Sequence, residues 1–99
     1  MLLSPTLVKP PVPIGTYDTN VPDMAEWART GEFASFTPIA NITGQPAISL
    51  PIDQTADGLP IGIQLTGPPA GEALLLSLAT QLEAARPWTD RRAPVEAAA

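Results

Sequence analysis

Apolar residues near the end of the chain recur with the spacing of a helix over residues 72–85. Three leucines lie at i, i+4 and i+8, and two more apolar residues widen the stripe: Leu74, Leu78 and Leu82, then Leu75 and Ala79. Gly71 can serve as the N-cap, and Pro87 ends the helix. Because burying one leucine contributes about 1.5–3 kcal/mol, we expect this face to dock on another layer of the fold.

Two strands are expected before this helix. Residues 47–52 are mostly apolar, and residues 61–66 alternate apolar side chains with small or polar ones, which predicts a strand with one apolar face. Pro60 suits the first position of the second strand, where a missing N–H does least harm. Asp57 and Gly58 mark a tight turn, so the two strands can pair as a hairpin.

The first half of the chain predicts shorter elements. Residues 2–8 are typical of a short buried strand, and residues 9–13 of a stiff extended segment, because three prolines fix φ and remove backbone donors. The spacing of Pro10 and Pro13 would also suit a proline-rich ligand of an SH3-type domain, an alternative that rests on this segment alone. Residues 15–21 are expected to form a loop.

A short helix is expected after this loop. Asn20 can cap it, Pro22 suits its first turn, and Asp23 places negative charge near the positive helix end. Three residues at i, i+3 and i+4 give it one apolar face: Met24, Trp27 and Ala28. Gly31 is expected to supply the left-handed residue that ends it.

A second helix of about two turns is expected directly afterwards. Thr37 is its predicted N-cap, Pro38 its first residue and Gly44 its C-terminal stop. Its residues are almost entirely apolar, so we expect it to be buried.

Composition excludes several classes of function. The chain has 99 residues, enough for one small domain, with five basic and ten acidic residues and a formal net charge of −5. Such a charge repels phosphate, so neither nucleic acid nor an anionic membrane surface is an expected partner. No apolar run approaches the roughly 20 residues that cross a bilayer, and the first residues lack the pattern of a signal peptide. We therefore expect a soluble, cytoplasmic protein.

The candidate chemistry is sparse. Without histidine or cysteine, the chain cannot hold a Ser-His-Asp or Cys-His mechanism, a disulfide or a thiolate metal site. Ser49 is interpreted as a packing residue, and Lys9, the sole lysine, lies in the proline-stiffened segment without a nearby serine pattern. Asp53 and Asp57 flank the hairpin turn, where solvated turn-forming carboxylates are commoner than a calcium or magnesium site. We expect no catalytic residue, metal or cofactor in this chain.

Two linked motifs resemble sequences near the end of amidase-signature enzymes. Residues 36–51, FTPIANITGQPAISLP, resemble the family pattern F-T-x-x-A-N-ϕ-x-G-x-P-A-ϕ-S-ϕ-P, in which ϕ is apolar. Residues 57–68, DGLPIGIQLTGP, resemble its G-L-P-ϕ-G-ϕ-Q-ϕ-x-G-P. Residues 3–6 resemble the preceding strand of the family. The ending over residues 85–92 is similar to amidases of the nylon-oligomer (aminohexanoate cyclic dimer) hydrolase type.

The resemblance covers almost the whole chain. It implies a C-terminal segment of an amidase-signature domain over residues 1–95, followed by a loose tail over residues 96–99. The implied fold is α/β, a large mixed sheet with helices on its faces, of which this chain supplies one hairpin and a C-terminal amphipathic helix.

The implied reaction is hydrolysis of a carboxamide to a carboxylate and an amine or ammonia. The family's serine nucleophile, activated through a second serine with a cis peptide and a lysine, belongs to signatures that this chain does not contain. The chain alone is therefore expected to be inactive, with the missing N-terminal catalytic portion as its partner. The alternative is a non-catalytic module that self-associates as a homodimer or docks on a partner through its leucine face.

Six residues of the two motifs are interpreted as structural: Thr37, Asn41, Gly44, Pro46, Gly62 and Gln64. Gly44 and Pro46 would turn the buried helix into the strand, and Asn41 would bond backbone in a buried bend. Gly62 would allow a close approach, and Gln64 would brace a neighbouring loop.

One departure from the family pattern bears on the substrate. Relatives that handle glutamine on transfer RNA often carry an acid two residues before the aromatic of the F/Y-T pair, and this chain has Ala34 before Phe36. An uncharged residue there removes a partner for a substrate ammonium. The resemblance thus implies a neutral, apolar amide substrate for the longer enzyme, with Ala34 and Phe36 near its pocket.

Overall fold

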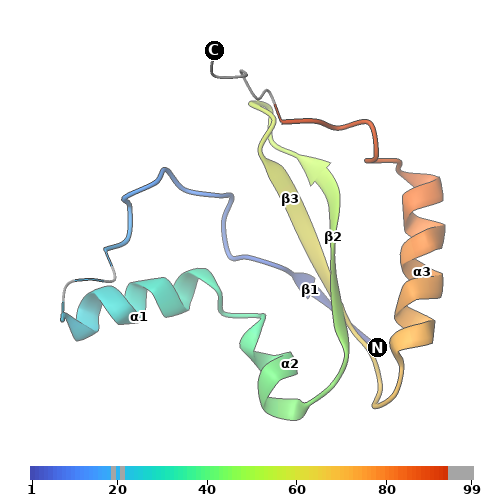
Figure 1. Ribbon diagram of the computed structural model, residues 1–99, viewed down its shortest axis with the longest axis horizontal. Helices are drawn as coiled ribbons and strands as arrows, with labels where there is room; N and C mark the ends of the chain where they lie inside the picture. The colour runs from blue at the N-terminus through green and yellow to red at the C-terminus, as the bar shows by residue number, and fades with distance from the viewer. Residues whose placement is uncertain (19, 21, 94–99) are drawn as a thin grey trace.

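The structure, a computed structural model, describes residues 1–18, 20 and 22–93 (Figure 1). Its elements follow one another in the order β1 Leu2–Pro5, α1 Met24–Phe33, α2 Pro38–Thr43, β2 Ala47–Gln54, β3 Pro60–Thr66 and α3 Glu72–Ala85. The tail expected over residues 96–99 lies outside the described residues. The α/β class predicted from the sequence is confirmed, with helices on both sides of a small sheet (Figure 1).

The sheet has three antiparallel strands in the order β1-β3-β2. The predicted hairpin is confirmed, because β2 pairs with β3 from Ala47↔Thr66 to Gln54↔Pro60, with an irregularity between Leu50 and Asp53. In its turn Gly58 has a φ of 88°, a left-handed conformation that favours glycine.

The core lies between the hairpin and α3. Four buried apolar residues form it: Leu50, Leu65, Leu75 and Ala79. The predicted helix and its Gly71 N-cap are confirmed, but the buried stripe is centred on Leu75 and Ala79, while Leu74 is 50% exposed. A hairpin presents only two strands to the helix, so it covers the middle of the stripe and leaves Leu74 outside.

The first strand differs from its prediction in length and burial. β1 ends at Pro5 instead of residue 8, and Leu2 and Leu3 are 51% and 64% exposed. It is an edge strand that pairs with β3 on one side only, from Leu2↔Thr66 to Pro5↔Ile63. Its exposure follows from that position, because no described element covers its outer side.

Residues 8–37, which we call the excursion, leave the sheet and return to it (Figure 1). Within the excursion, Asp23 caps α1 instead of Asn20, because its Oδ1 accepts the Ala25 N–H at 2.8 Å. The helix continues past Gly31 to Phe33, and Gly31 does not adopt a positive φ. The predicted cap and stop were therefore both wrong.

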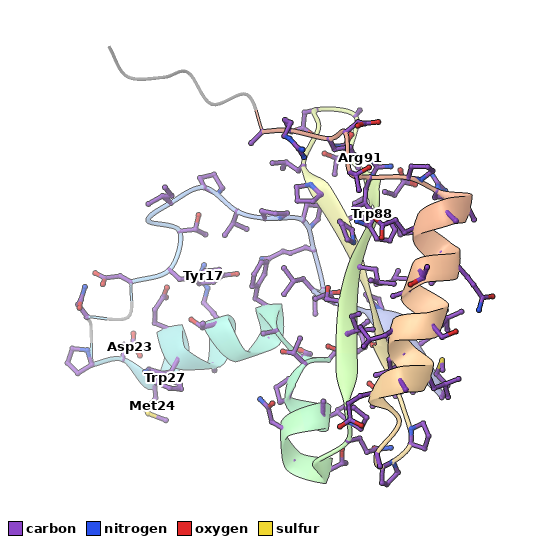
Figure 2. All side chains as sticks on the ribbon, turned by 45° about the vertical axis from the view of Figure 1, so that its right-hand side comes forward. Tyr17, Asp23, Met24, Trp27, Trp88 and Arg91 are labelled. Carbon is purple, nitrogen blue, oxygen red and sulfur yellow. The ribbon has the colours of Figure 1, made fainter. Side chains whose placement is uncertain are left out.

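The apolar face of α1 is largely uncovered. Met24 is 82% and Trp27 68% exposed, and Figure 2 shows both side chains directed away from the rest of the molecule. α2 has its predicted bounds, yet it is also uncovered: Ile42 is 84% exposed, and no α2 residue is buried. The expectation of a buried helix was wrong, because no described element lies over it.

Candidate functional site

The face of the sheet turned away from α3 carries small and polar side chains. Ile63 and Leu65 contribute to the core, so strand alternation turns Gly62, Gln64 and Thr66 to the opposite face. At one end of this face lies a cavity of about 460 Å³ lined by residues 5–10 and 60–62 and by two residues of β2, Ser49 and Pro51. Four prolines and several aliphatic side chains make its wall mainly apolar.

A pair of hydroxyl groups forms the polar part of this cavity. Thr6 Oγ1, directly after β1, and Ser49 Oγ of β2 lie 2.7 Å apart and share a hydrogen bond. Gly62 separates the two strands at this point, and a Cβ built there would lie 2.8 Å from Thr6 Oγ1 and 3.3 Å from Ser49 Oγ. The glycine thus leaves the space that brings the hydroxyls together.

These hydroxyls can bind a polar group, but none of the residues that the structure describes is placed to activate them. The nucleophile of a serine hydrolase needs an adjacent base, and among the described residues Ser49 has only the Thr6 hydroxyl as a side-chain partner. Lys9 lines the same cavity, but its ammonium lies over the Tyr17 and Phe33 rings, 5.8 and 5.9 Å from their centres. This pair was missed from the sequence, although both Thr6 and Ser49 lie within the family motifs.

Gln64 joins this face to the end of the excursion. It is only 5% exposed, and its Nε2 donates to the Phe36 carbonyl at 3.3 Å. Thr37 occupies the N-cap position of α2, but its hydroxyl donates back to the Ala34 carbonyl at 3.3 Å and makes no cap bond. Ala34 and Phe36, both half-buried, are thereby held near the face that carries the cavity.

The other motif residues lie around α2 and the start of β2. Gly44 has a φ of 70° and donates its N–H to the Ala40 carbonyl at 2.9 Å, which ends α2 in a left-handed residue. Pro46 leads into β2, and its carbonyl accepts the Gly67 N–H at 2.8 Å. Asn41 is exposed, so the buried bend expected around it does not exist in the described residues. Its amide needs no protein partner while water reaches it.

No two titratable groups among the described residues are arranged as a pair for general acid–base catalysis. The pKa of Asp57 lies below its ordinary value because the Thr55 hydroxyl and the Asp57 backbone N–H stabilise the carboxylate. That group stands in the exposed hairpin turn. Asp53 faces Arg86 at 3.4 Å on the surface. Within the described ranges, no cluster of three or more potential metal ligands occurs.

A second hollow of about 560 Å³ lies where the chain leaves α3. It is formed by the hairpin turn and by residues 88–93. Trp88 packs against the core from this segment, and Arg91 Nη1 donates to the Pro51 carbonyl of β2 at 3.2 Å (Figure 2). These contacts attach the end of the described chain to the edge of the hairpin.

None of the helices in the described part of the chain has the length and apolar character that crossing a bilayer requires.

Comparison with known proteins defines the class. The family model named Amidase matches residues 1–76, so the chain belongs to the amidase family. AmiC of Mycobacterium tuberculosis, named as an amidase, is 42% identical over 99 residues, which span 95% of this chain and 20% of that protein. The 6-aminohexanoate-cyclic-dimer hydrolase of Paenarthrobacter ureafaciens is 51% identical over 61 residues, 62% of this chain and 12% of that protein.

Solved structures match in fold as well. A structure of 6-aminohexanoate cyclic dimer hydrolase superimposes with a TM-score of 0.79 at 38% identity, over 91% of this chain and 20% of that one. The same enzyme complexed with substrate gives 0.78. The resemblance to amidases of this type is thus confirmed, and the chain is similar to the C-terminal part of their fold. It spans about a fifth of the length of these relatives.

Proposed function

We propose that this chain acts as the C-terminal segment, over residues 1–95, of an amidase that works in the cytoplasm. Such an enzyme adds water across a carboxamide C–N bond and releases a carboxylate and an amine or ammonia. The match of 91% of the chain to a solved amide hydrolase at 38% identity carries this proposal. The serine, cis-serine and lysine that perform the reaction would lie in the remainder of the enzyme.

The chain alone is expected to be inactive. It has no histidine or cysteine, and its hydroxyl pair Thr6–Ser49 has no base among the described residues. Its contribution would be a wall of the substrate site, because the mainly apolar cavity and the Phe36 segment lie on one face of the sheet.

The substrate is proposed to be a neutral amide with apolar arms. The uncharged Ala34 removes a partner for a substrate ammonium, and Gln64 holds the neighbouring Phe36 at the face of the sheet that carries the apolar cavity. The matched solved enzyme is itself named for a cyclic dimer of 6-aminohexanoate.

The test begins with the native protein recovered from source cells with an antibody against this chain. A species several times larger than 10.3 kDa is expected on a denaturing gel. It should release amine or ammonia from apolar amides faster than from free glutamine, while the purified 99-residue chain should release none. Faster turnover of glutamine would contradict the substrate proposal, and turnover by the isolated chain would contradict its assignment as a non-catalytic part.

The second candidate is a non-catalytic module that forms a homodimer. The exposed apolar side chains of the excursion favour it: Ile14, Met24 and Trp27. Light scattering on the pure chain tests it, since a strict monomer at high concentration would count against self-association.

A further inference from the structure

The hydroxyl pair of the apolar cavity has hydrogen-bonding capacity left over. Thr6 Oγ1 and Ser49 Oγ lie 2.7 Å apart, and either hydroxyl can donate to the other. The shared bond uses one of their two hydrogens. Neither hydroxyl makes another hydrogen bond within the part of the chain that the structure describes. One hydroxyl is therefore free to donate its hydrogen, and the oxygen of the other is free to accept one.

A free donor beside a free acceptor is the complement of a carboxamide. The planar carboxamide group presents a C=O that accepts and an N–H that donates. In a primary amide or a small lactam, the C=O and an N–H lie on the same edge of this plane. Such an edge can close a ring of hydrogen bonds with the two hydroxyls, in which each bond polarises the next. A trans secondary amide turns the two groups in opposite directions and can use only one of them.

The charges around the cavity favour a neutral ligand. No acidic residue is among the described residues that line it, and Lys9 is their one cation. The Lys9 ammonium lies over the Tyr17 and Phe33 rings, and neither ring belongs to the described lining. A cationic ligand would find no carboxylate here, and an anionic ligand would have to draw Lys9 away from these rings. A neutral ligand pays neither penalty.

The backbone of the wall competes little with the hydroxyl pair. Four lining residues are prolines, which have no N–H: Pro5, Pro10, Pro51 and Pro60. The Thr6 N–H already donates to the Gly62 carbonyl at 3.1 Å. The Val8 N–H donates to the Phe33 carbonyl at 3.2 Å. The volume of about 460 Å³ lies in the range of roughly 300–1,000 Å³ that ligand pockets occupy, with few polar groups in a mainly apolar wall.

We propose that this cavity binds a primary carboxamide or a small lactam, with the amide edge on the Thr6–Ser49 hydroxyl pair and the carbon chain against the prolines. This assignment rests on the proposed function, and it narrows the substrate from neutral amides in general to those whose N–H lies beside the C=O. Gly62 makes the room, since a Cβ there would lie 2.8 Å from Thr6 Oγ1. The pair holds and orients the amide, while hydrolysis stays with the remainder of the enzyme.

The test titrates the 99-residue chain with ε-caprolactam, a small lactam, and follows the backbone amides by NMR. Shifts are expected at residues 5–10 and 60–62 and at Ser49, the positions that line the cavity. N-methylcaprolactam keeps the ring and the C=O but lacks the N–H. It should bind about tenfold more weakly, the size expected for one lost hydrogen bond. The charged, open-chain 6-aminohexanoate should cause no shifts in the cavity.

Variants of the pair test the same contact from the protein side. Thr6→Val and Ser49→Ala each leave one hydroxyl, which can serve only one group of the amide edge. Each should weaken caprolactam binding by about tenfold and remove the preference over N-methylcaprolactam. Thr6→Ser keeps the hydroxyl and should bind like the parent chain. Each variant must retain the circular dichroism spectrum of the parent, and the comparison of the two lactams needs no variant.

Three results would overturn the proposal: no shifts at the cavity, equal affinities of the parent chain for the two lactams, or a loss in Thr6→Ser as large as in Thr6→Val. Preferential binding of 6-aminohexanoate would assign the cavity to a charged ligand and reject it as well. Hydrolysis by the native protein is measured separately, so lactam binding can fail while the proposed function stands. Lactam binding by a native protein that hydrolyses no amide would reject the proposed function instead.

Discussion

The hairpin with α3 and the excursion are held in different ways. All four buried apolar residues belong to the hairpin and α3, whereas α1 and α2 contain none. The excursion is attached to the sheet by a directional contact instead, because Gln64 Nε2 donates to the Phe36 carbonyl at 3.3 Å. Its own two ends are joined where the Val8 N–H donates to the Phe33 carbonyl at 3.2 Å. Within the excursion, Lys9 lies over the Tyr17 and Phe33 rings.

The difference shows which part of the chain is stabilised by contacts among its own residues. Burial is roughly proportional to the apolar area removed from water, so a helix that packs on a hairpin stabilises the chain without further partners. Each directional contact contributes only about 0.5–1.5 kcal/mol, and the excursion leaves Met24 and Trp27 in water. We infer that the excursion takes its stability from a surface that the described residues do not supply.

The largest expected contrast comes from truncating one side chain in each region. Leu75→Ala empties a site that is 3% exposed and should lower the free energy of unfolding by about 2–5 kcal/mol. Trp27→Ala, in α1, should change it by less than about 0.5 kcal/mol because that side chain is 68% exposed. Urea unfolding followed by circular dichroism measures both. Equal losses would show that α1 is packed in solution and would remove the contrast.

Two glycines give a second contrast. Gly62→Ala places a Cβ 2.8 Å from Thr6 Oγ1 and should destabilise the chain by about 1–3 kcal/mol. Gly31→Ala meets nothing within 4 Å inside α1 and should stabilise it by about 0.5–1 kcal/mol. Thermal unfolding by circular dichroism reports both signs. A stabilising Gly62→Ala would mean that β1 and β2 do not approach at this point.

The same contrast explains what the sequence could predict. Periodicity located the hairpin and α3, whose central apolar residues pack against one another inside the described residues. It also located α2, whose ends are set locally by Pro38 and by the left-handed Gly44. Burial of α2 was predicted wrongly because an apolar sequence shows that a surface needs cover and not which chain provides it.

The wrong N-cap at α1 and the missed hydroxyl pair in the site have other causes. Asn20 and Asp23 are both good N-caps, and only the geometry shows that Asp23 binds the Ala25 N–H. The Thr6–Ser49 pair joins residues 43 positions apart, and no local pattern encodes such a contact. The exposure of Asn41 could not be predicted from the sequence either, because it depends on what covers α2.

The hydroxyl of Thr66, in the region formed by the hairpin and α3, gives a third contrast. Its hydroxyl is buried without a hydrogen-bond partner among the described residues, which costs free energy. Thr66→Val should therefore stabilise the isolated chain by about 1 kcal/mol. Thr6→Val, which removes a hydroxyl bonded to Ser49, should destabilise it by about 0.5–1.5 kcal/mol. If urea unfolding shows both variants destabilised, Thr66 has a partner in solution.

The smallest expected effect lies in the exposed hairpin turn. The pKa of Asp57 is lowered from its ordinary value of 3.8, first by the Thr55 hydroxyl and then by its own backbone N–H. A lowered folded-state pKa adds stability above the unfolded value, and this is lost as the pH falls through the folded value, so the effect is confined below about pH 4. Thr55→Ala should raise the Asp57 pKa toward 3.8, while Thr55→Ser should retain the shift.

An NMR titration of the Asp57 carboxyl measures this directly. Because the carboxyl is fully exposed, the shift should be a local property of the turn and leave unfolding near pH 7 unchanged. An unshifted pKa in the parent chain would mean that the turn opens in solution, even though the strands beside it carry the core. A persistent shift in Thr55→Ala would assign it to the backbone N–H instead. Either result would separate the rigidity of the turn from the burial that stabilises the hairpin and α3.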